Sequence, residues 1–370
     1  MQRLLRHVLI AVWAVAALAA GHAQAPAPLR LAIAGLVHGH VASFIRGAQA
    51  RTDVQIVGVF ERDAALLRSY GEKYSIPESA RFGDLKTMID RAQPEAIASF
   101  TNTKDHPDVV DAAAPRHVHV MMEKPLAVSN ADAQRIRRAA ESGRIQVLVN
   151  YETTWYASHG AMWTLLKERK AAGDIRKMVA MDGHNGPKAI NVQPEFLDWL
   201  SDPARNGGGA LFDFGCYGAN LMTWMMDGGR PLAVTAVTQQ FQPDVYPRVD
   251  DEATILLEYP RAQGIIQASW NWPAGRKDFE VYGDRGLAIA TGGAGLRIAL
   301  PNEPDHATTP APRPPDERDS ISHLIAVVRG VRAPNALSSL ENNLVVTEIL
   351  EAARESARTH ARVRLPARPR

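Results

Sequence analysis

The stretch Leu29–His40, LRLAIAGLVHGH, decides the fold of this chain. Its apolar beginning predicts a β-strand, and the glycines that follow predict a tight turn into a helix from about Val41. Strand, glycine turn and helix in this order typically bind a dinucleotide, because free N–H groups at the helix N-terminus attract phosphate. The pattern is incomplete, since Val37 and His40 stand where the second and third glycines are expected and Gly39 is out of register. A plain strand-to-helix turn is therefore an alternative.

The charges after the second predicted strand, residues 54–60, bear on cofactor choice. Glu61 lies 26 positions after Gly35, close to the spacing at which an acid binds the adenosine ribose of NAD. Its charge disfavours the 2′-phosphate of NADP, whereas the adjacent Arg62 could bind that phosphate. The sequence thus favours NAD slightly and leaves NADP open; the alternative is that these charges only solvate a strand end.

Strands and helices continue to alternate as far as residue 149, which predicts a doubly wound parallel α/β sheet. In such sheets ligands bind at the carboxyl ends of the strands. Glu123-Lys124-Pro125 follows one predicted strand, so Lys124 is expected at this edge. The candidate cofactor contacts are Gly35, Val37, His38, Gly39, His40, Glu61, Arg62, Thr101, Asn102, His106, Glu123 and Lys124.

The second half of the chain has a different pattern. Longer alternating strands between residues 177 and 291 predict a mostly antiparallel sheet backed by helices, an α+β domain. A glycine-rich turn at 207–209 precedes a helix predicted from Ala210. On that helix Asp213 and Tyr217 are four residues apart and share one face, where both could reach a substrate hydroxyl. The alternative is that Asp213 begins the helix and Tyr217 packs in the core.

The amino terminus predicts export. Arg3 and Arg6 precede an uncharged apolar run, residues 8–20, and Ala23-Gln24-Ala25 resembles a cleavage site. Residues 1–25 are therefore expected to be a Sec-type signal peptide and the protein to be periplasmic, with a retained anchor as the alternative. Removing them leaves 40 basic against 40 acidic residues, from 42 and 40 in the full chain. This balance gives no indication of nucleic-acid binding or of a stable membrane partner.

These features together resemble the Gfo/Idh/MocA family of oxidoreductases. The resemblance rests on the first half, on Glu123-Lys124-Pro125, on the glycine turn before Asp213-x-Gly215-x-Tyr217, and on the segment from residue 340 onwards. It implies a nicotinamide enzyme that transfers hydride to or from a sugar or polyol. Lys124, Asp213 and Tyr217 would then be catalytic, with Lys124 and Tyr217 assisting proton transfer. The implied substrate contacts are Tyr151, Trp155, His184 and Trp270.

The resemblance also implies a domain layout and a homo-oligomer. A nucleotide-binding domain is expected over residues 26–150 and a substrate and oligomerisation domain over 151–370, with the helix at 337–360 packing back towards the first. Export leaves two further functions open, because free NAD is not expected outside the cytoplasm. One is a glycoside hydrolase or lyase that oxidises its substrate transiently with a tightly bound NAD; the other is a non-catalytic sugar-binding protein. The histidines are scattered along the sequence, so no metal site is expected.

Overall fold

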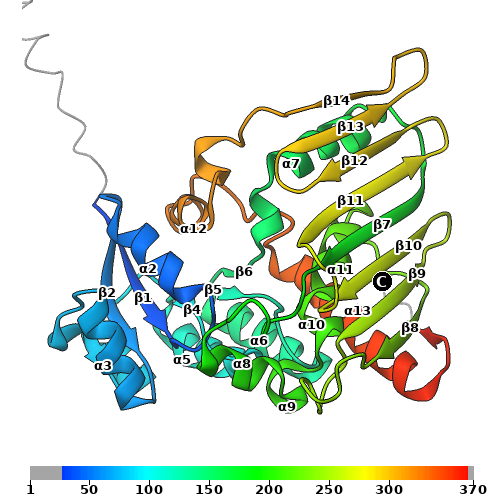
Figure 1. Ribbon diagram of the computed structural model, residues 1–370. Helices are drawn as coiled ribbons and strands as arrows, with labels where there is room; N and C mark the ends of the chain where they lie inside the picture. The colour runs from blue at the N-terminus through cyan, green and yellow to red at the C-terminus, as the bar shows by residue number, and fades with distance from the viewer. Residues whose placement is uncertain (1–26, 366–370) are drawn as a thin grey trace, which may run out of the picture.

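The computed structural model describes residues 27–365, and the predicted signal peptide lies outside them. Figure 1 shows a first half built on a parallel sheet and a second half in which a large sheet faces it across the molecule. The first sheet has the strand order β3-β2-β1-β4-β5-β6. The strands are β1 (Leu29–Ala34), β2 (Val54–Phe60), β3 (Arg81–Phe82), β4 (Ala96–Ser99), β5 (His119–Glu123) and β6 (Val147–Asn150). This order confirms the predicted doubly wound sheet, with its switch point between β1 and β4.

Helices cover both faces of this sheet. They are α2 (Val41–Gln49), α3 (Ala64–Lys73), α4 (Leu85–Ala92), α5 (His106–Ala113) and α6 (Asn130–Gly143). Three of these helices have a side-chain oxygen as N-cap: Asp63 caps α3, Asp84 caps α4 and Ser129 caps α6. Each cap accepts N–H groups that the first helical turn leaves unpaired.

The second sheet has nine strands in the order β14-β13-β12-β11-β7-β10-β9-β8-β15. Its strands are β7 (Ile175–Gly183), β8 (Ala233–Gln239), β9 (Glu252–Glu258), β10 (Gln263–Ser269), β11 (Arg276–Gly283), β12 (Leu287–Thr291), β13 (Gly295–Ala299), β14 (His306–Thr308) and β15 (Val363–Arg364). The prediction of a mostly antiparallel sheet is confirmed, and β7 with β10 is the parallel pair within the described part of this second sheet. Buried and half-exposed residues alternate along β9, as expected for a sheet with one covered face.

Helices of the second half fall into two groups. One group lies along the sheet or beside the site: α7 (Ala157–Trp163), α8 (Pro194–Leu200), α9 (Pro203–Asn206), α10 (Ala210–Asp213) and α11 (Gly215–Met225). The other returns to the first half: α12 (Ser320–Val328) and α13 (Leu340–Thr359). Helix α7 continues into a π-helical turn at Thr164–Glu168. No helix among the described residues is long and apolar enough to cross a membrane.

Two apolar clusters hold the halves together. Leu31 and Ile33 of β1 point to one cluster, which also contains Leu324 of α12. Ala32 and Ala34 point to the other, which continues through α11 and α13 into the nine-stranded sheet. Alternation along β1 therefore divides its residues between the two clusters, as the two-residue period of a strand requires.

Candidate active site

A cavity of about 500 Å³ lies where the carboxyl edge of the parallel sheet meets the second half. The cavity is lined by the loops that follow β1, β5, β6, β7 and β12, by α8, α10 and α11, and by the facing ends of β7 and β11. Seven of the residues predicted from sequence reach this cavity. They are His38, Gly39, His40, Lys124, His184, Asp213 and Tyr217.

Lys124 and Asp213 form a buried ion pair on the cavity wall. Nζ of Lys124 also donates to the backbone oxygen of Asp213 at 3.0 Å. The second carboxylate oxygen of Asp213 accepts from Nε1 of Trp270 at 2.9 Å. Burial alone lowers the pKa of Lys124, but the Asp213 carboxylate offsets this and the pKa lies above its usual value. Lys124 is therefore a fixed, protonated donor rather than a base at neutral pH.

Tyr217 lies in the first turn of α11, next to this pair. The ring centroid is 5.2 Å from Nζ of Lys124. Burial raises the pKa of Tyr217 well above its usual value, so its hydroxyl is protonated at neutral pH. The predicted continuous helix is wrong, because Asp213 ends α10 and Tyr217 belongs to α11. Both side chains nevertheless reach the same cavity.

Sequence reasoning missed Lys277, a second lysine close to the Tyr217 ring. Its Nζ lies 4.7 Å from the Tyr217 ring centroid and pairs with Glu152. Both charged residues line the cavity, as does Tyr156, whose hydroxyl donates to Glu152 at 2.6 Å. The alternation of β11 predicts which of its residues share a face, but only the pairing of β11 with β7 brings Lys277 to the cavity.

The four predicted substrate contacts have different positions. His184 lines the cavity, and burial lowers its pKa, so it is a neutral imidazole there. Tyr151 and Trp270 are fully buried behind the wall rather than on it: Tyr151 packs edge-on against Tyr217, and Trp270 orients Asp213. Trp155 lies in a neighbouring cavity and donates to Asn150.

The glycine loop keeps part of its expected shape. Gly35 has φ +85°, and a Cβ there would meet Thr101 at 2.7 Å, so glycine is required for this turn. Glu61 does not point into solvent, since its two oxygens accept N–H groups of Leu36 and Asp63. It therefore fixes the loop.

Helix α8 covers this loop, which the sequence did not indicate. Nε1 of Trp199 donates to the backbone oxygen of Val37 at 3.1 Å. Phe196 packs on the ring of His38, with centroids 4.8 Å apart. Phe196 and Trp199 are three residues apart in a short helix that begins at Pro194, and this spacing was the one sequence feature that could have indicated an apolar helix face here.

The remaining predicted cofactor contacts lie beside the loop in structural roles. Asn102 caps the turn at Thr103–Asp105. Thr101 is bonded to its own neighbours, and buried His106 bonds the backbone oxygen of Leu126. Arg62 is exposed and pairs with Asp105. Glu123, at the end of β5, contacts His40.

Comparison with known proteins agrees with this architecture. Residues 29–151 match the family described as "Oxidoreductase family, NAD-binding Rossmann fold", and residues 161–289 match the "GFO/IDH/MocA C-terminal domain". Trans-1,2-dihydrobenzene-1,2-diol dehydrogenase of Sus scrofa is 24% identical over 287 residues, covering 77% of this chain and 80% of the relative. Among solved structures, aldose-aldose oxidoreductase from Caulobacter crescentus has a TM-score of 0.78 at 24% identity, covering 91% of this chain and all of that one. An inositol dehydrogenase homolog from Azotobacter vinelandii, solved with NAD⁺, has a TM-score of 0.78 at 20% identity, covering 91% of this chain and 97% of that one.

A Rossmann domain joined to a large mostly antiparallel sheet, with a site between them, defines an NAD(P)-dependent dehydrogenase. The chain belongs to the Gfo/Idh/MocA family of NAD-binding oxidoreductases.

The residues of the loop fit a dinucleotide, with a modified phosphate cradle. The N–H groups of Leu36 and His38 are bonded to Glu61 and to the Phe100 backbone, respectively. Within residues 27–365, those of Val37 and Gly39 make no hydrogen bond to protein, so they remain available to a phosphate at the start of α2. Gly39 also borders the cavity that holds Lys124.

Proposed function

We propose that this protein interconverts a secondary hydroxyl and a carbonyl on a sugar, polyol or related diol, using NAD(H). The observation that carries the proposal is the arrangement of Lys124, Asp213 and Tyr217 on one cavity wall that continues into the glycine loop. Two protonated donors that converge there suit an oxygen on which negative charge develops.

In the reducing direction, a bound NADH, held by the N–H groups of Val37 and Gly39, would supply hydride to the carbonyl carbon and become NAD⁺. As the C–H bond forms, the carbonyl π electrons move to oxygen, which takes the proton of the Tyr217 hydroxyl. Lys124 hydrogen-bonds the same oxygen and remains charged because Asp213 stabilises it. The tyrosinate then regains a proton from solvent. The raised pKa of Tyr217 keeps its hydroxyl protonated at neutral pH, as a proton donor must be at the start of the reduction.

The cavity wall supports a small polyhydroxylated substrate. Lys277, Glu152 and His184 add charged and neutral hydrogen-bonding groups around the proposed reacting oxygen. The apolar ring of Phe196 also lines the cavity and offers a surface on which a sugar face can pack. A volume of about 500 Å³ is in the range of small-molecule sites. The dehydrogenase relatives act on a dihydrodiol by name, which is consistent with a vicinal diol or sugar.

We also propose export to the periplasm with a cofactor held through many turnovers. A second carbonyl or hydroxyl compound would then have to return the bound cofactor to its starting oxidation state after each net redox reaction. With a cofactor that stays bound, the enzyme could instead be a hydrolase or lyase that oxidises its substrate, eliminates a group and reduces the product again. Such an enzyme would use the same Lys124, Asp213 and Tyr217. The two reactions differ in their products, because only the dehydrogenase changes the oxidation state of the sugar.

The first test is to denature the purified, processed protein and identify any released nucleotide by mass spectrometry. Stoichiometric NAD(H) supports the proposal, and a protein that neither holds nor binds added NAD(P) contradicts it. Turnover of a panel of aldoses, polyols and glycosides is then followed by product mass. A product two hydrogens lighter or heavier than its substrate indicates net redox chemistry, whereas cleavage without this change indicates the hydrolase or lyase.

Lys124→Met tests the catalytic assignment. Loss of Lys124 removes a charged donor from the reacting oxygen, so turnover should fall by about 10²–10³-fold, as for other oxyanion donors. Nucleotide content should stay near that of the parent. Lys188→Met alters an exposed lysine outside the cavity and should leave turnover unchanged. Equal turnover of Lys124→Met and the parent would remove Lys124 from the mechanism.

A further inference from the structure

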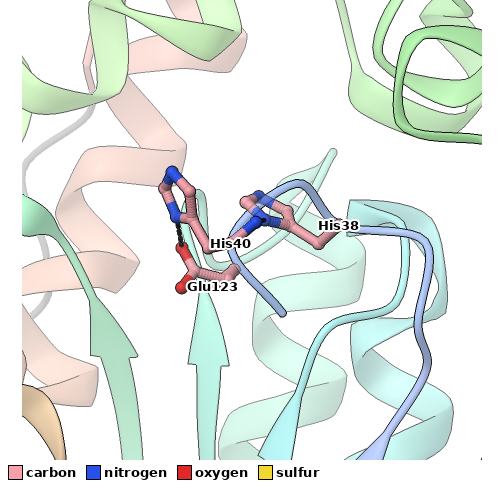
Figure 2. A group of neighbouring side chains, drawn as sticks. All are labelled: His38, His40 and Glu123. Carbon is pink, nitrogen blue, oxygen red and sulfur yellow. Dashed lines mark hydrogen bonds and ion pairs between the residues drawn. The ribbon is translucent and has the colours of Figure 1, made fainter. Parts of the chain in front are cut away.

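Two histidines and a carboxylate meet at the mouth of the glycine loop. His38 and His40 come from the loop after β1, and Glu123 ends β5; Figure 2 shows both rings beside the carboxylate. One ligand atom from each residue lies within 4.8 Å of the others. The expectation that the histidines are scattered does not hold here, because the loop and the strand end are neighbours only in the folded chain.

The carboxylate of Glu123 is a buried negative charge whose hydrogen-bond partners are one histidine and one amide. Its side chain is 2% exposed. One oxygen contacts Nδ1 of His40 at 3.1 Å and the other accepts from Asn150 at 2.8 Å. The adjacent Lys124 turns away and pairs with Asp213 instead. A buried carboxylate is stable only when it is paired or bound to a cation, so this one is suited to a stronger positive charge.

His38 supplies an independent observation. Its ring is buried, and its Nε2 has no hydrogen-bond partner among the described residues. Its Nδ1 accepts a long bond, 3.2 Å, from the backbone N–H of His40. A buried polar atom without a partner costs free energy, and coordination of a metal would satisfy it. Binding through Nε2 would move the ring proton to Nδ1 and give up only that long bond.

We propose that His38, His40 and Glu123 bind a divalent transition-metal ion of the Zn²⁺ type. Two imidazoles and one carboxylate form a ligand set known for such ions, whereas Mg²⁺ and Ca²⁺ prefer oxygen alone. Tetrahedral bonds of about 2.0–2.2 Å place ligand atoms about 3.3 Å apart, so the cluster must contract modestly. His40 can provide this movement, because its side chain is 47% exposed.

The ion would border the cavity of the proposed reaction. His38 and His40 line that cavity with Lys124, so a ligand in the cavity would be within reach of a free coordination position. It would also place positive charge beside a phosphate loop in which valine and histidine replace two glycines. This site is separate from the Lys124–Asp213 pair and does not depend on the proposed reaction.

The test measures binding of Zn²⁺ to the full processed chain, purified with a histidine-free tag and stripped with a chelator. Isothermal titration should show one equivalent, and Co²⁺ substitution should give visible absorption bands that change when a ligand is lost. His40→Ala and Glu123→Gln should each weaken affinity by about 100-fold or more, since even outer contacts of metal ligands are worth 10–100-fold. His306→Ala, an exposed histidine on β14, should bind as the parent does.

Thermal unfolding of the apo variants separates binding from folding. His40 is half-exposed, so His40→Ala should unfold close to the parent in the absence of metal. Zn²⁺ should raise the midpoint of the parent and of His306→Ala but not that of His40→Ala. The proposal is overturned if the folded parent binds no Zn²⁺, or if His40→Ala and Glu123→Gln both retain the parent's affinity and Co²⁺ spectrum.

Discussion

Burial determines the protonation of the proposed catalytic groups. Two lysines lie near the Tyr217 ring, but desolvation keeps the pKa of Tyr217 high, and Lys124 keeps its proton because of Asp213. The sequence predicted Lys124, Asp213 and Tyr217 as candidates, because their motifs are local. It could not predict Lys277, whose position depends on the pairing of β11 with β7.

Tyr217→Phe is expected to lower kcat for carbonyl reduction by about 10²–10⁴-fold, the range for loss of a general acid. KM should change little, because the ring and its packing on Tyr151 remain. Steady-state kinetics with a carbonyl substrate provide the measurement. Tyr282→Phe removes a hydroxyl on β11 that bonds Glu280 and serves as the control. A rise in KM at unchanged kcat would mean that the Tyr217 hydroxyl only binds substrate.

Asp182 should make the stability of the folded protein depend on pH, in a direction that its environment determines. Burial raises its pKa well above the usual value, and one of its oxygens lacks a hydrogen-bond partner among the described residues. The folded state thus binds this proton more tightly than the unfolded state. The resulting stability is complete below the unfolded pKa, near 3.9, and is lost as the pH rises through the raised folded pKa.

Asp182→Asn removes this titration. The variant should gain stability relative to the parent as the pH increases from acid to neutral, which urea unfolding at several pH values can measure. Asp90→Asn is the control of opposite sign, because a hydrogen bond from Arg116 lowers the pKa of exposed Asp90. A stability difference between Asp182→Asn and the parent that does not vary with pH would contradict the burial argument.

At the scale of elements, the break between α10 and α11 determines the site. The sequence predicted one helix from Ala210, and residue spacing gave no reason to divide it. In the structure Lys124 and the thiol of Cys216 both donate to the Asp213 backbone oxygen, and Tyr217 N–H bonds Phe214 instead. Lys124, which binds the backbone oxygen of Asp213, lies 89 residues away in the sequence, so local helix propensity could not reveal this break.

Asp250 holds the start of α10 from a separate loop. Its carboxylate accepts the N–H groups of Gly209 at 2.9 Å and Leu211 at 2.6 Å. Asp250→Ala should cost about 2 kcal/mol, as expected for loss of a helix cap with buried N–H groups left unpaired. Turnover should also fall, because α10 positions Asp213.

Asp250→Asn retains an oxygen acceptor for one of those N–H groups. It should therefore recover part of both the stability and the turnover, as measured by urea unfolding and initial rates. If alanine and asparagine were equally active and equally stable, the cap would not be what positions α10.

At the scale of the molecule, the two halves are joined by α12, a helix that follows the second sheet in the sequence but packs in the core of the first half. The sequence predicted both sheets, because each follows from local periodicity. It did not predict that α12 completes the Rossmann core, where Ile321 and Leu324 pack with Leu31 and Ile33. Nor could it give the strand order of the nine-stranded sheet, in which β7 lies between β10 and β11. Domain boundaries and the homo-oligomer stay predictions.

Because α12 belongs to the first half's core, the two halves should unfold together. Leu324→Ala should destabilise the protein by about 2–5 kcal/mol, the usual cost of truncating a buried leucine. The tryptophans of the described chain all lie between residues 155 and 272, so their fluorescence reports on the second half and, through Trp155 and Trp199, on its contacts with the first. Far-UV circular dichroism reports on both halves. In Leu324→Ala the two signals should shift to the same lower urea midpoint, whereas Ile190→Ala, at an exposed position, should leave both within about 0.5 kcal/mol of the parent. A fluorescence transition that stayed at the parent's midpoint while the dichroism transition moved would show that the halves are independent units, and that α12 stabilises only the first.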